Sequence, residues 1–148
     1  MKEAYKEALK AQIKDEVPIG CVIVKDDKVI ARGHNLRETR QQAKNHAEVV
    51  AIEKACRKMN SWRLEDCELY VTVEPCMMCM GMIQQARIAK VVYGAKDLKG
   101  GCCHTVIDYM SVKGFNHYPE ITGGVDEEEC SSLISDYFRN KRRNKQGG

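Results

Sequence analysis

The chain has 148 residues, of which 43% are hydrophobic and 30% charged, and its formal net charge is +3. This size and composition predict one globular domain over residues 1–148, leave no room for two full domains, and indicate no particular partner through charge alone. No apolar run reaches the ~20 residues of a membrane-spanning helix, and the charged start Met1-Lys2-Glu3 lacks the apolar stretch of a secretory signal, so we expect a cytoplasmic protein outside membranes.

The first half of the chain predicts a helix, a β-hairpin, a second helix and a strand. Residues 2–14 carry apolar side chains at helical spacing, and the segment Val17-Pro18-Ile19-Gly20 ends this pattern. Two β-branched runs at 19–24 and 29–33 flank a polar turn, which is typical of a hairpin. A helix is then expected from Ala47 to Met59, beginning near His46, and a strand over residues 69–73.

The second half continues this alternation. Residues 77–86 predict a helix with Pro75 at its first turn, and residues 91–93 a strand. A polar loop at 96–101, a short helix at 105–111 and a brief strand at 119–122 follow. An acidic run at 126–129 opens a last amphipathic helix, whose expected inward side chains are Leu133, Ile134, Tyr137 and Phe138. The order predicts an α/β fold, a three-layer α/β/α sandwich with a mixed, mainly five-stranded sheet.

The excess positive charge lies in a basic helix end at residues 139–148. This segment holds five basic residues and no acid, so the rest of the chain carries 19 basic and 21 acidic groups. The five are Arg139, Lys141, Arg142, Arg143 and Lys145. Cations suit the C-terminal end of a helix dipole, and they equally suit contacts to RNA phosphates, so both interpretations stay open.

The eight cysteines differ in their sequence surroundings. Three sit singly within apolar segments, as small buried residues do: Cys21, Cys56 and Cys67. In a reducing compartment, the pair Cys76 and Cys79 favours a metal site over a disulfide. Cys102, Cys103 and His104 could suggest a second metal site, but adjacent cysteines chelate one tetrahedral ion poorly. We therefore interpret these as small loop residues.

Two short motifs stand at the starts of two predicted helices, His46-Ala47-Glu48 and Pro75-Cys76-Met77-Met78-Cys79. Sulfurs three residues apart at a helix N-terminus can face one ion, and the helix dipole favours their thiolate form. One imidazole and two thiolates are ligands that Zn²⁺ accepts, and a structural site would normally add a fourth protein ligand. An open fourth position suits a water, from which Glu48 could take a proton.

Together the motifs read H-x-E … P-C-x-x-C, with 30 residues from His46 to Cys76. This is the signature of the zinc-dependent nucleobase deaminases, in which the glutamate is a general acid and base and binds no metal. Taken alone, His46 is better explained as a buried or capping histidine, and Glu48 as an acid favoured in the first turn of a helix. Their combination with the cysteine pair favours a catalytic zinc site.

Further segments across nearly the whole chain carry a closer resemblance. They are Glu16-Val17-Pro18-Ile19-Gly20, Gly33-His34-Asn35-Leu36-Arg37-Glu38, Ser61-Trp62-Arg63-Leu64, Tyr70-Val71-Thr72-Val73-Glu74-Pro75-Cys76, Val92-Tyr93-Gly94-Ala95-Lys96-Asp97 and Phe115-Asn116-His117. With these, the sequence resembles the bacterial tRNA adenosine deaminases. The resemblance implies a cytidine-deaminase-like fold, a homodimer, and conversion of the wobble adenosine in a tRNA anticodon stem-loop to inosine.

The resemblance also implies roles for individual residues. His46, Cys76 and Cys79 would hold one Zn²⁺ per subunit, and Glu48 would be the catalytic proton shuttle. The implied substrate-binding residues are Asn35, Ala47, Pro75, Asp97 and Lys99, with Asn35 on the target base. The segment Cys102-Cys103-His104-Thr105-Val106-Ile107 departs from the family pattern at unchanged length, which concerns loop contacts to RNA and leaves the zinc chemistry unaffected.

Two alternative functions share these features. A deaminase of free nucleobases or nucleosides, of adenine, guanine or cytosine type, would use the same zinc chemistry with a different pocket. A zinc-stabilised RNA-binding module would need neither Glu48 nor an open ligand position. The loop at 96–101 and the basic helix end favour an RNA substrate over a free base, and the methionine-rich helix after Cys79 is a candidate dimer interface.

Overall fold

The computed structural model describes residues 1–147, so Gly148 of the predicted basic segment lies outside the described residues. Its helices and strands are α1 (Lys2–Ile13), β1 (Gly20–Lys25), β2 (Lys28–His34), α2 (Arg37–Arg40), α3 (Ala47–Met59), β3 (Cys67–Val73), α4 (Met77–Ala86), β4 (Lys90–Ala95), the 3-10 helix η1 (Tyr109–Ser111), β5 (Glu120–Thr122) and α5 (Glu127–Gly147). None of the helices among these residues is long and apolar enough to cross a bilayer.

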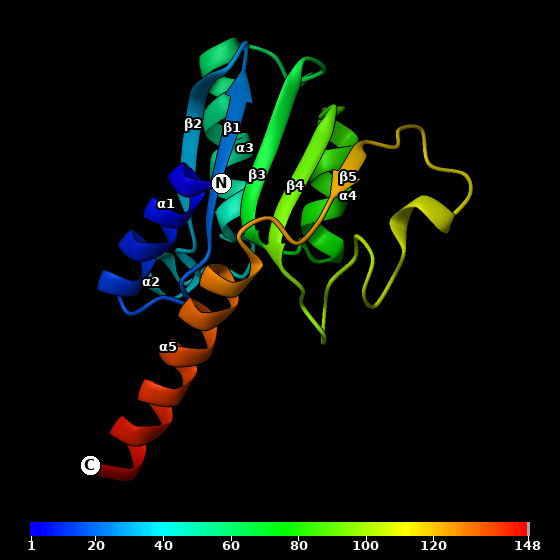
Figure 1. Ribbon diagram of the computed structural model, residues 1–148. Coiled ribbons are helices and arrows are strands. Elements are labelled where there is room, and N and C mark those ends of the chain that lie inside the picture. Colours follow the sequence, from blue (N-terminus) through cyan, green and yellow to red (C-terminus); the bar gives the residue numbers. More distant parts are fainter. Residues whose placement is uncertain (148) are drawn as a thin grey trace.

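The strands form one mixed sheet in the order β2-β1-β3-β4-β5. β1 is antiparallel to both β2 and β3, whereas β3, β4 and β5 are parallel. Helices α1 and α5 cover one face of this sheet, and α3 and α4 cover the other (Figure 1). The predicted three-layer sandwich on a five-stranded sheet is therefore confirmed.

Two glycines let the helices lie directly on the sheet. A Cβ on Gly20 of β1 would stand 2.0 Å from the carbonyl oxygen of Ala4 in α1. A Cβ on Gly33 of β2 would stand 2.7 Å from the carbonyl oxygen of Ala47, at the start of α3. Because no side chain separates the backbones, the N-terminus of α3 is held close to the end of β2. This contact positions one half of the candidate site.

The core fills both spaces between the sheet and its helices. Ile23 and Leu69 on one face of the sheet and Val22 and Val92 on the other are buried, as expected for a sheet covered on both faces. Cys21 and Cys67 are buried as predicted, whereas Cys56 is only half-buried near the end of α3.

Three local predictions differ from the structure. The short helix α2 was not predicted, because four polar residues without apolar periodicity give no helical signal. Of the helix expected at 105–111, only η1 forms. The backbone N–H of Thr105 instead binds the Glu74 carboxylate, and that of Val106 binds the carbonyl of Gly101. Pro75 precedes the N-cap Cys76 of α4, and so lies outside the first turn.

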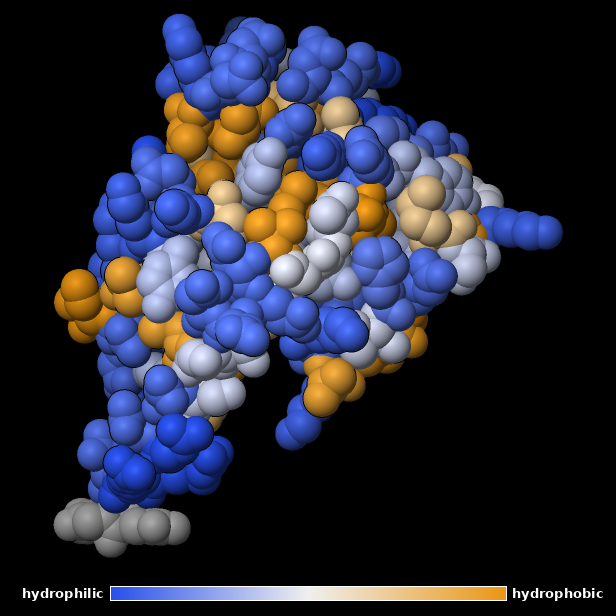
Figure 2. Space-filling view, viewed as in Figure 1, coloured by the Kyte–Doolittle hydropathy of each residue, from blue (hydrophilic) through white to orange (hydrophobic). Residues whose placement is uncertain are grey.

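Helix α5 begins against the sheet and ends beyond it (Figure 1). Leu133 and Tyr137 are buried and Ile134 is half-buried, but Phe138 is 42% exposed, so the inward orientation predicted for Phe138 is wrong. The helix has passed the edge of the sheet at this point, and mainly hydrophilic side chains cover the projecting part that is coloured in Figure 2. In this end, Lys141 pairs with Asp15 and Arg139 with Asp136.

Candidate active site

The site lies where the ends of β2 and β3 feed the starts of α3 and α4. Strand β2 runs in the same direction as β3, because each is antiparallel to β1. Both strands therefore deliver the chain to the same edge of the sheet. His46 is the N-cap of α3 and Cys76 the N-cap of α4, each with extended backbone angles, and Cys79 follows in the first turn of α4.

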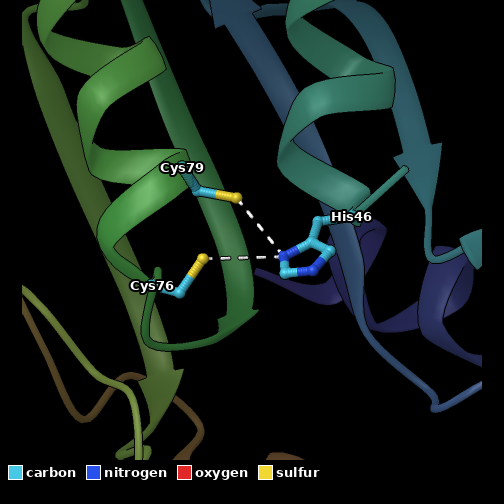
Figure 3. Close-up of side chains that lie close together, drawn as sticks. All are labelled: His46, Cys76 and Cys79. Atoms are coloured by element: carbon cyan, nitrogen blue, oxygen red, sulfur yellow. Dashed lines mark hydrogen bonds between the residues drawn. The ribbon is translucent and has the colours of Figure 1, made fainter. Parts of the chain in front are cut away.

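The three predicted metal ligands meet there (Figure 3). The Nδ1 atom of His46 lies 3.6 Å from the sulfur of Cys76 and 3.6 Å from that of Cys79. In a tetrahedral zinc site with ordinary Zn–N and Zn–S bonds, such atoms are about 3.6 Å apart. The side chains of His46, Cys76 and Cys79 thus fit Zn²⁺ in both donor type and spacing.

The electrostatics of this cluster favour a bound cation. A hydrogen bond from Cys79, assisted by His46, lowers the pKa of the Cys76 thiol to about 4, although burial opposes the shift. The pKa of Cys79 is raised, first because its proton is shared with Cys76 and then by burial. Two helix N-termini point at the cluster and stabilise negative charge on sulfur. If a cation replaced the proton that Cys76 and Cys79 share, both side chains would be thiolates.

Glu48 stands beside these residues in the first turn of α3. It is 4% exposed, and burial raises the pKa of its carboxyl to about 7. Within residues 1–147, the clustered metal-type ligands are His46, Cys76 and Cys79 alone, so Glu48 is not among them. A buried carboxyl that titrates near neutral pH can both take and return a proton.

The remaining predicted site residues surround the cluster in different ways. Ala47 and Pro75 are buried at the two helix starts. Asn35, 6% exposed, follows β2; its Oδ1 accepts the N–H of Arg37 at 3.1 Å, and its Nδ2 donates weakly to Val17 O at 3.4 Å. Asn35 also lines a groove of about 460 Å³. The residue after Asn35, Leu36, donates its backbone N–H to the carbonyl of Asn45 at 3.0 Å, directly before His46, whereas the described lining of the groove does not include His46, Cys76 or Cys79.

Asp97 and Lys99 occupy the loop after β4. The Oδ1 of Asp97 accepts the N–H groups of Lys99 at 3.1 Å and Gly100 at 3.2 Å, so this side chain shapes the loop. The side chain of Lys99 is exposed to solvent. A substrate role for either residue remains a prediction.

Glu74 organises the same loop, and sequence reasoning missed it. This buried carboxylate accepts backbone N–H groups from Asp97 at 3.2 Å, Cys103 at 3.0 Å, His104 at 2.8 Å and Thr105 at 3.0 Å, and the Thr105 hydroxyl at 2.5 Å. Although burial opposes ionisation, these donors hold the pKa of Glu74 below its usual value. The sequence signal that could have identified Glu74 is an acidic residue at the end of a buried strand.

Glu16 likewise organises a segment of backbone, the one that follows β2. Its buried carboxylate accepts the backbone N–H groups of Glu38 at 3.1 Å and Thr39 at 2.5 Å. It therefore anchors α2, the segment that follows Asn35. The signal in the sequence was an acid directly before the strand-leading segment Val17-Pro18.

The pair Cys102 and Cys103 forms no second metal cluster with His104 within residues 1–147. The Cys103 thiol is buried 3.6 Å from the sulfur of Met80, and His104 Nδ1 lies 2.7 Å from the Tyr93 hydroxyl. These contacts give Cys103 and His104 structural roles in the segment after β4.

Comparisons with known proteins agree with this geometry. A family model described as MafB19-like deaminase matches residues 1–142. The tRNA-specific adenosine deaminase of Bacillus subtilis (strain 168) is 51% identical over 145 residues, covering 98% of this chain and 90% of the relative. A solved structure from a study of A-to-I editing by tRNA:A34 deaminases superposes with a TM-score of 0.87 at 40% identity, covering 90% of this chain and 96% of the other.

Guanine deaminase from Nitrosomonas europaea has a similar fold, with a TM-score of 0.76, but is only 19% identical, over 92% of this chain and 81% of the other. That likeness concerns the architecture alone. The close relatives share both the fold and the sequence over nearly the full length. The chain therefore belongs to the family of tRNA-specific adenosine deaminases.

Proposed function

We propose that this protein hydrolyses the wobble adenosine of a tRNA anticodon to inosine, with release of ammonia. The observation that carries the proposal is the convergence of His46, Cys76 and Cys79 beside the buried Glu48. It occurs in a chain 51% identical to a tRNA-specific adenosine deaminase. The deaminase unit comprises the whole chain, and the compartment is the cytoplasm, where tRNA is found.

His46, Cys76 and Cys79 would hold one Zn²⁺, which when bound supplies a Lewis acid that makes water nucleophilic at neutral pH. The Glu48 carboxylate takes a proton from the attacking water and donates it to a ring nitrogen of the base. The oxygen adds to the carbon that bears the amine. Glu48 then passes the second proton of the water to the departing nitrogen, which leaves as ammonia.

The substrate reaches this site as an extruded base. An anticodon loop is already unpaired, so extrusion costs less there than in a duplex. Asn35 would hydrogen-bond the base, exchanging its long 3.4 Å contact to Val17 for a substrate contact. Ala47 and Pro75 would form the walls beside the base, and the loop with Asp97 and Lys99 would contact the neighbouring nucleotides.

A homodimer is part of the proposal. Apolar side chains around an open cavity of about 330 Å³ include Met77, Ile107, Val112 and Phe115. Met77 is 70% exposed although it belongs to a methionine-rich helix, whereas Met80 in the same helix is buried. A second copy of the chain would cover this apolar surface and remove it from water.

The decisive experiment measures inosine formation in a synthetic anticodon stem-loop with adenosine at the wobble position, using zinc-loaded protein. We expect turnover of the stem-loop and none of free adenosine under the same conditions. If the protein were inactive on the stem-loop but turned over free adenosine, guanine or cytosine, the result would instead favour a free-base deaminase.

Loss of one thiolate should remove the metal. Losing a residue that only hydrogen-bonds a metal ligand typically lowers metal affinity by roughly 10–100-fold. Because Cys79→Ser removes a ligand itself, we expect zinc affinity to fall by more than this. Cys56→Ser removes a half-buried thiol outside the cluster and should retain about one zinc per chain. Elemental analysis after dialysis measures both. Equal zinc content in the two variants would contradict the assigned ligand set.

A further inference from the structure

The groove beside Asn35 carries charges that the proposed chemistry does not use. It is about 460 Å³ in volume and lies between the end of α1, the start of α2 and the face of α5. Three cations and three acids line it: Lys14, Arg37, Lys141, Asp15, Glu16 and Glu38. Whether it attracts an anion depends on which of these charges are already paired.

Two of the acids have partners within the protein. Asp15 accepts from Lys141 Nζ at 2.5 Å, so these two charges offset each other. Glu16 accepts the backbone N–H groups at the start of α2. By contrast, among the residues that the structure describes, no carboxylate lies within 4.0 Å of the Lys14 ammonium or the Arg37 guanidinium. Among the described residues of this groove, two cations, Lys14 and Arg37, and one acid, Glu38, are therefore without an ion-pair partner.

Lys14 is held in place by a buried histidine. Its Nζ lies 2.9 Å from Nε2 of His34, and Nδ1 of His34 lies 3.1 Å from Oε1 of Glu7. An ammonium group can only donate, so Nε2 must accept, and the proton of a neutral His34 must stand on Nδ1 and be donated to Glu7. The contact therefore orients Lys14 without cancelling its positive charge.

The surroundings of His34 favour this neutral form. His34 is 9% exposed, and burial lowers the pKa of its ring, although the Glu7 carboxylate opposes the shift. Lys14 from the end of α1 and Lys54 from α3 add to the lowering. Glu7 also accepts from Lys10 Nζ at 2.7 Å, which completes a chain of four polar side chains from α1 to the end of β2.

His34 is the last residue of β2, and Asn35 follows it directly. The strand end therefore fixes two groups at once: the Asn35 amide and, through the His34 ring, the Lys14 ammonium. Both side chains line the same groove, with Arg37 two residues further along. A nucleotide joins a base to a phosphate. Its binding site would therefore require a group for the base, here the Asn35 amide, beside a fixed cation for the phosphate, here Lys14.

We propose that Lys14, positioned by the Glu7–His34 pair, and Arg37 bind an RNA phosphodiester next to the target adenosine. This inference rests on the proposed function, because the expected position of the adenosine comes from Asn35. Lys14 and Arg37 are binding residues, and His34 is a positioning residue that acts through Lys14. RNA phosphates recruit such cations by releasing counterions, so the contact contributes to affinity and to its salt dependence.

The first test compares single variants in steady-state deamination of the stem-loop. We expect Lys14→Met to raise KM about 5–10-fold with kcat within about twofold, and to reduce the slope of log affinity against log salt by about 0.7. Lys58→Met removes an equal charge from the far end of α3 and should change neither quantity. Equal KM values and salt slopes for Lys14→Met and the wild type would overturn the proposal.

The second test separates positioning from fold maintenance. His34→Leu should raise KM in the same direction, and adding Lys14→Met to it should have no further effect, since both changes remove one contact. His34→Gln can accept from Lys14 and donate to Glu7 and should keep a near-wild-type KM. Full additivity of His34→Leu and Lys14→Met would show that His34 does not act through Lys14.

A chemical change in the substrate tests the contact directly. A stem-loop carries a neutral methylphosphonate at one or the other linkage flanking the target adenosine. At one of these linkages the change should raise KM for the wild type, and should raise KM of Lys14→Met by a smaller factor, because only the Arg37 contact is left to lose there. An equal rise in both proteins at each linkage would contradict the proposed contact. Absence of inosine formation by the zinc-loaded wild type would instead contradict the proposed function, so the two failures are distinguishable.

Discussion

Replacing Glu48 with glutamine should slow deamination about 10³-fold while leaving the protein folded and loaded with metal. The Glu48 carboxyl is fully buried beside His46 and Cys76 and is outside the group of clustered ligands. Glutamine keeps the shape of the side chain but cannot exchange a proton. We expect kcat to fall by about 10³-fold, within the range of general acid–base catalysis, measured as inosine formed in the stem-loop.

The binding properties of Glu48→Gln decide how a loss of activity is interpreted. Zinc content and the Kd for the stem-loop should stay within about twofold of the wild type, because the change alters a chemical step and no ligand. Glu53→Gln, on the same helix and paired with Lys44 at 3.1 Å, is the matched control and should retain full turnover. Loss of zinc from Glu48→Gln would identify Glu48 as a ligand and contradict the proposed mechanism.

Most of the fold could be predicted because its elements have clear periodicity. The hairpin runs at 19–24 and 29–33 and the helix from Ala47 to Met59 were found close to their observed bounds. The helix α2 escaped prediction because backbone donation to Glu16, a residue some 20 positions earlier, stabilises it. Exposure of Phe138 likewise depends on where the sheet ends, which no local pattern records.

The residues of the candidate site, too, could be predicted only in part. His46, Cys76 and Cys79 could be grouped because each lies at a helix start, and helix starts are marked by local sequence. The organising acids Glu74 and Glu16 could not be assigned, because their partners are backbone N–H groups of distant loops, which any residue type except proline supplies. The Lys14–His34 contact was missed for a related reason, since it joins two elements 20 residues apart.

Glu74→Gln should destabilise the protein and loosen the loop at 97–105. Hydrogen bonds to a charged acceptor contribute about 1.5–3 kcal/mol each, and glutamine offers one neutral acceptor and turns an NH₂ group toward the remaining donors. We expect a loss of about 3 kcal/mol in the free energy of unfolding, seen as a fall of roughly 10 °C in Tm for a chain of this size. Calorimetry of the zinc-loaded protein measures it.

The same substitution elsewhere on β3 gives the control. Among the described residues, the Glu68 carboxylate accepts only the Tyr70 hydroxyl, at 2.7 Å, so Glu68→Gln should stay within about 0.5 kcal/mol of the wild type. Thr105→Val removes one of the five donors to Glu74 and should cost about 1 kcal/mol.

Because Asp97 and Lys99 lie in the released loop, KM for the stem-loop should rise in Glu74→Gln while zinc content is retained. An unchanged Tm would mean that the loop keeps its conformation without this carboxylate, and that packing of Cys103 against Met80 holds it instead.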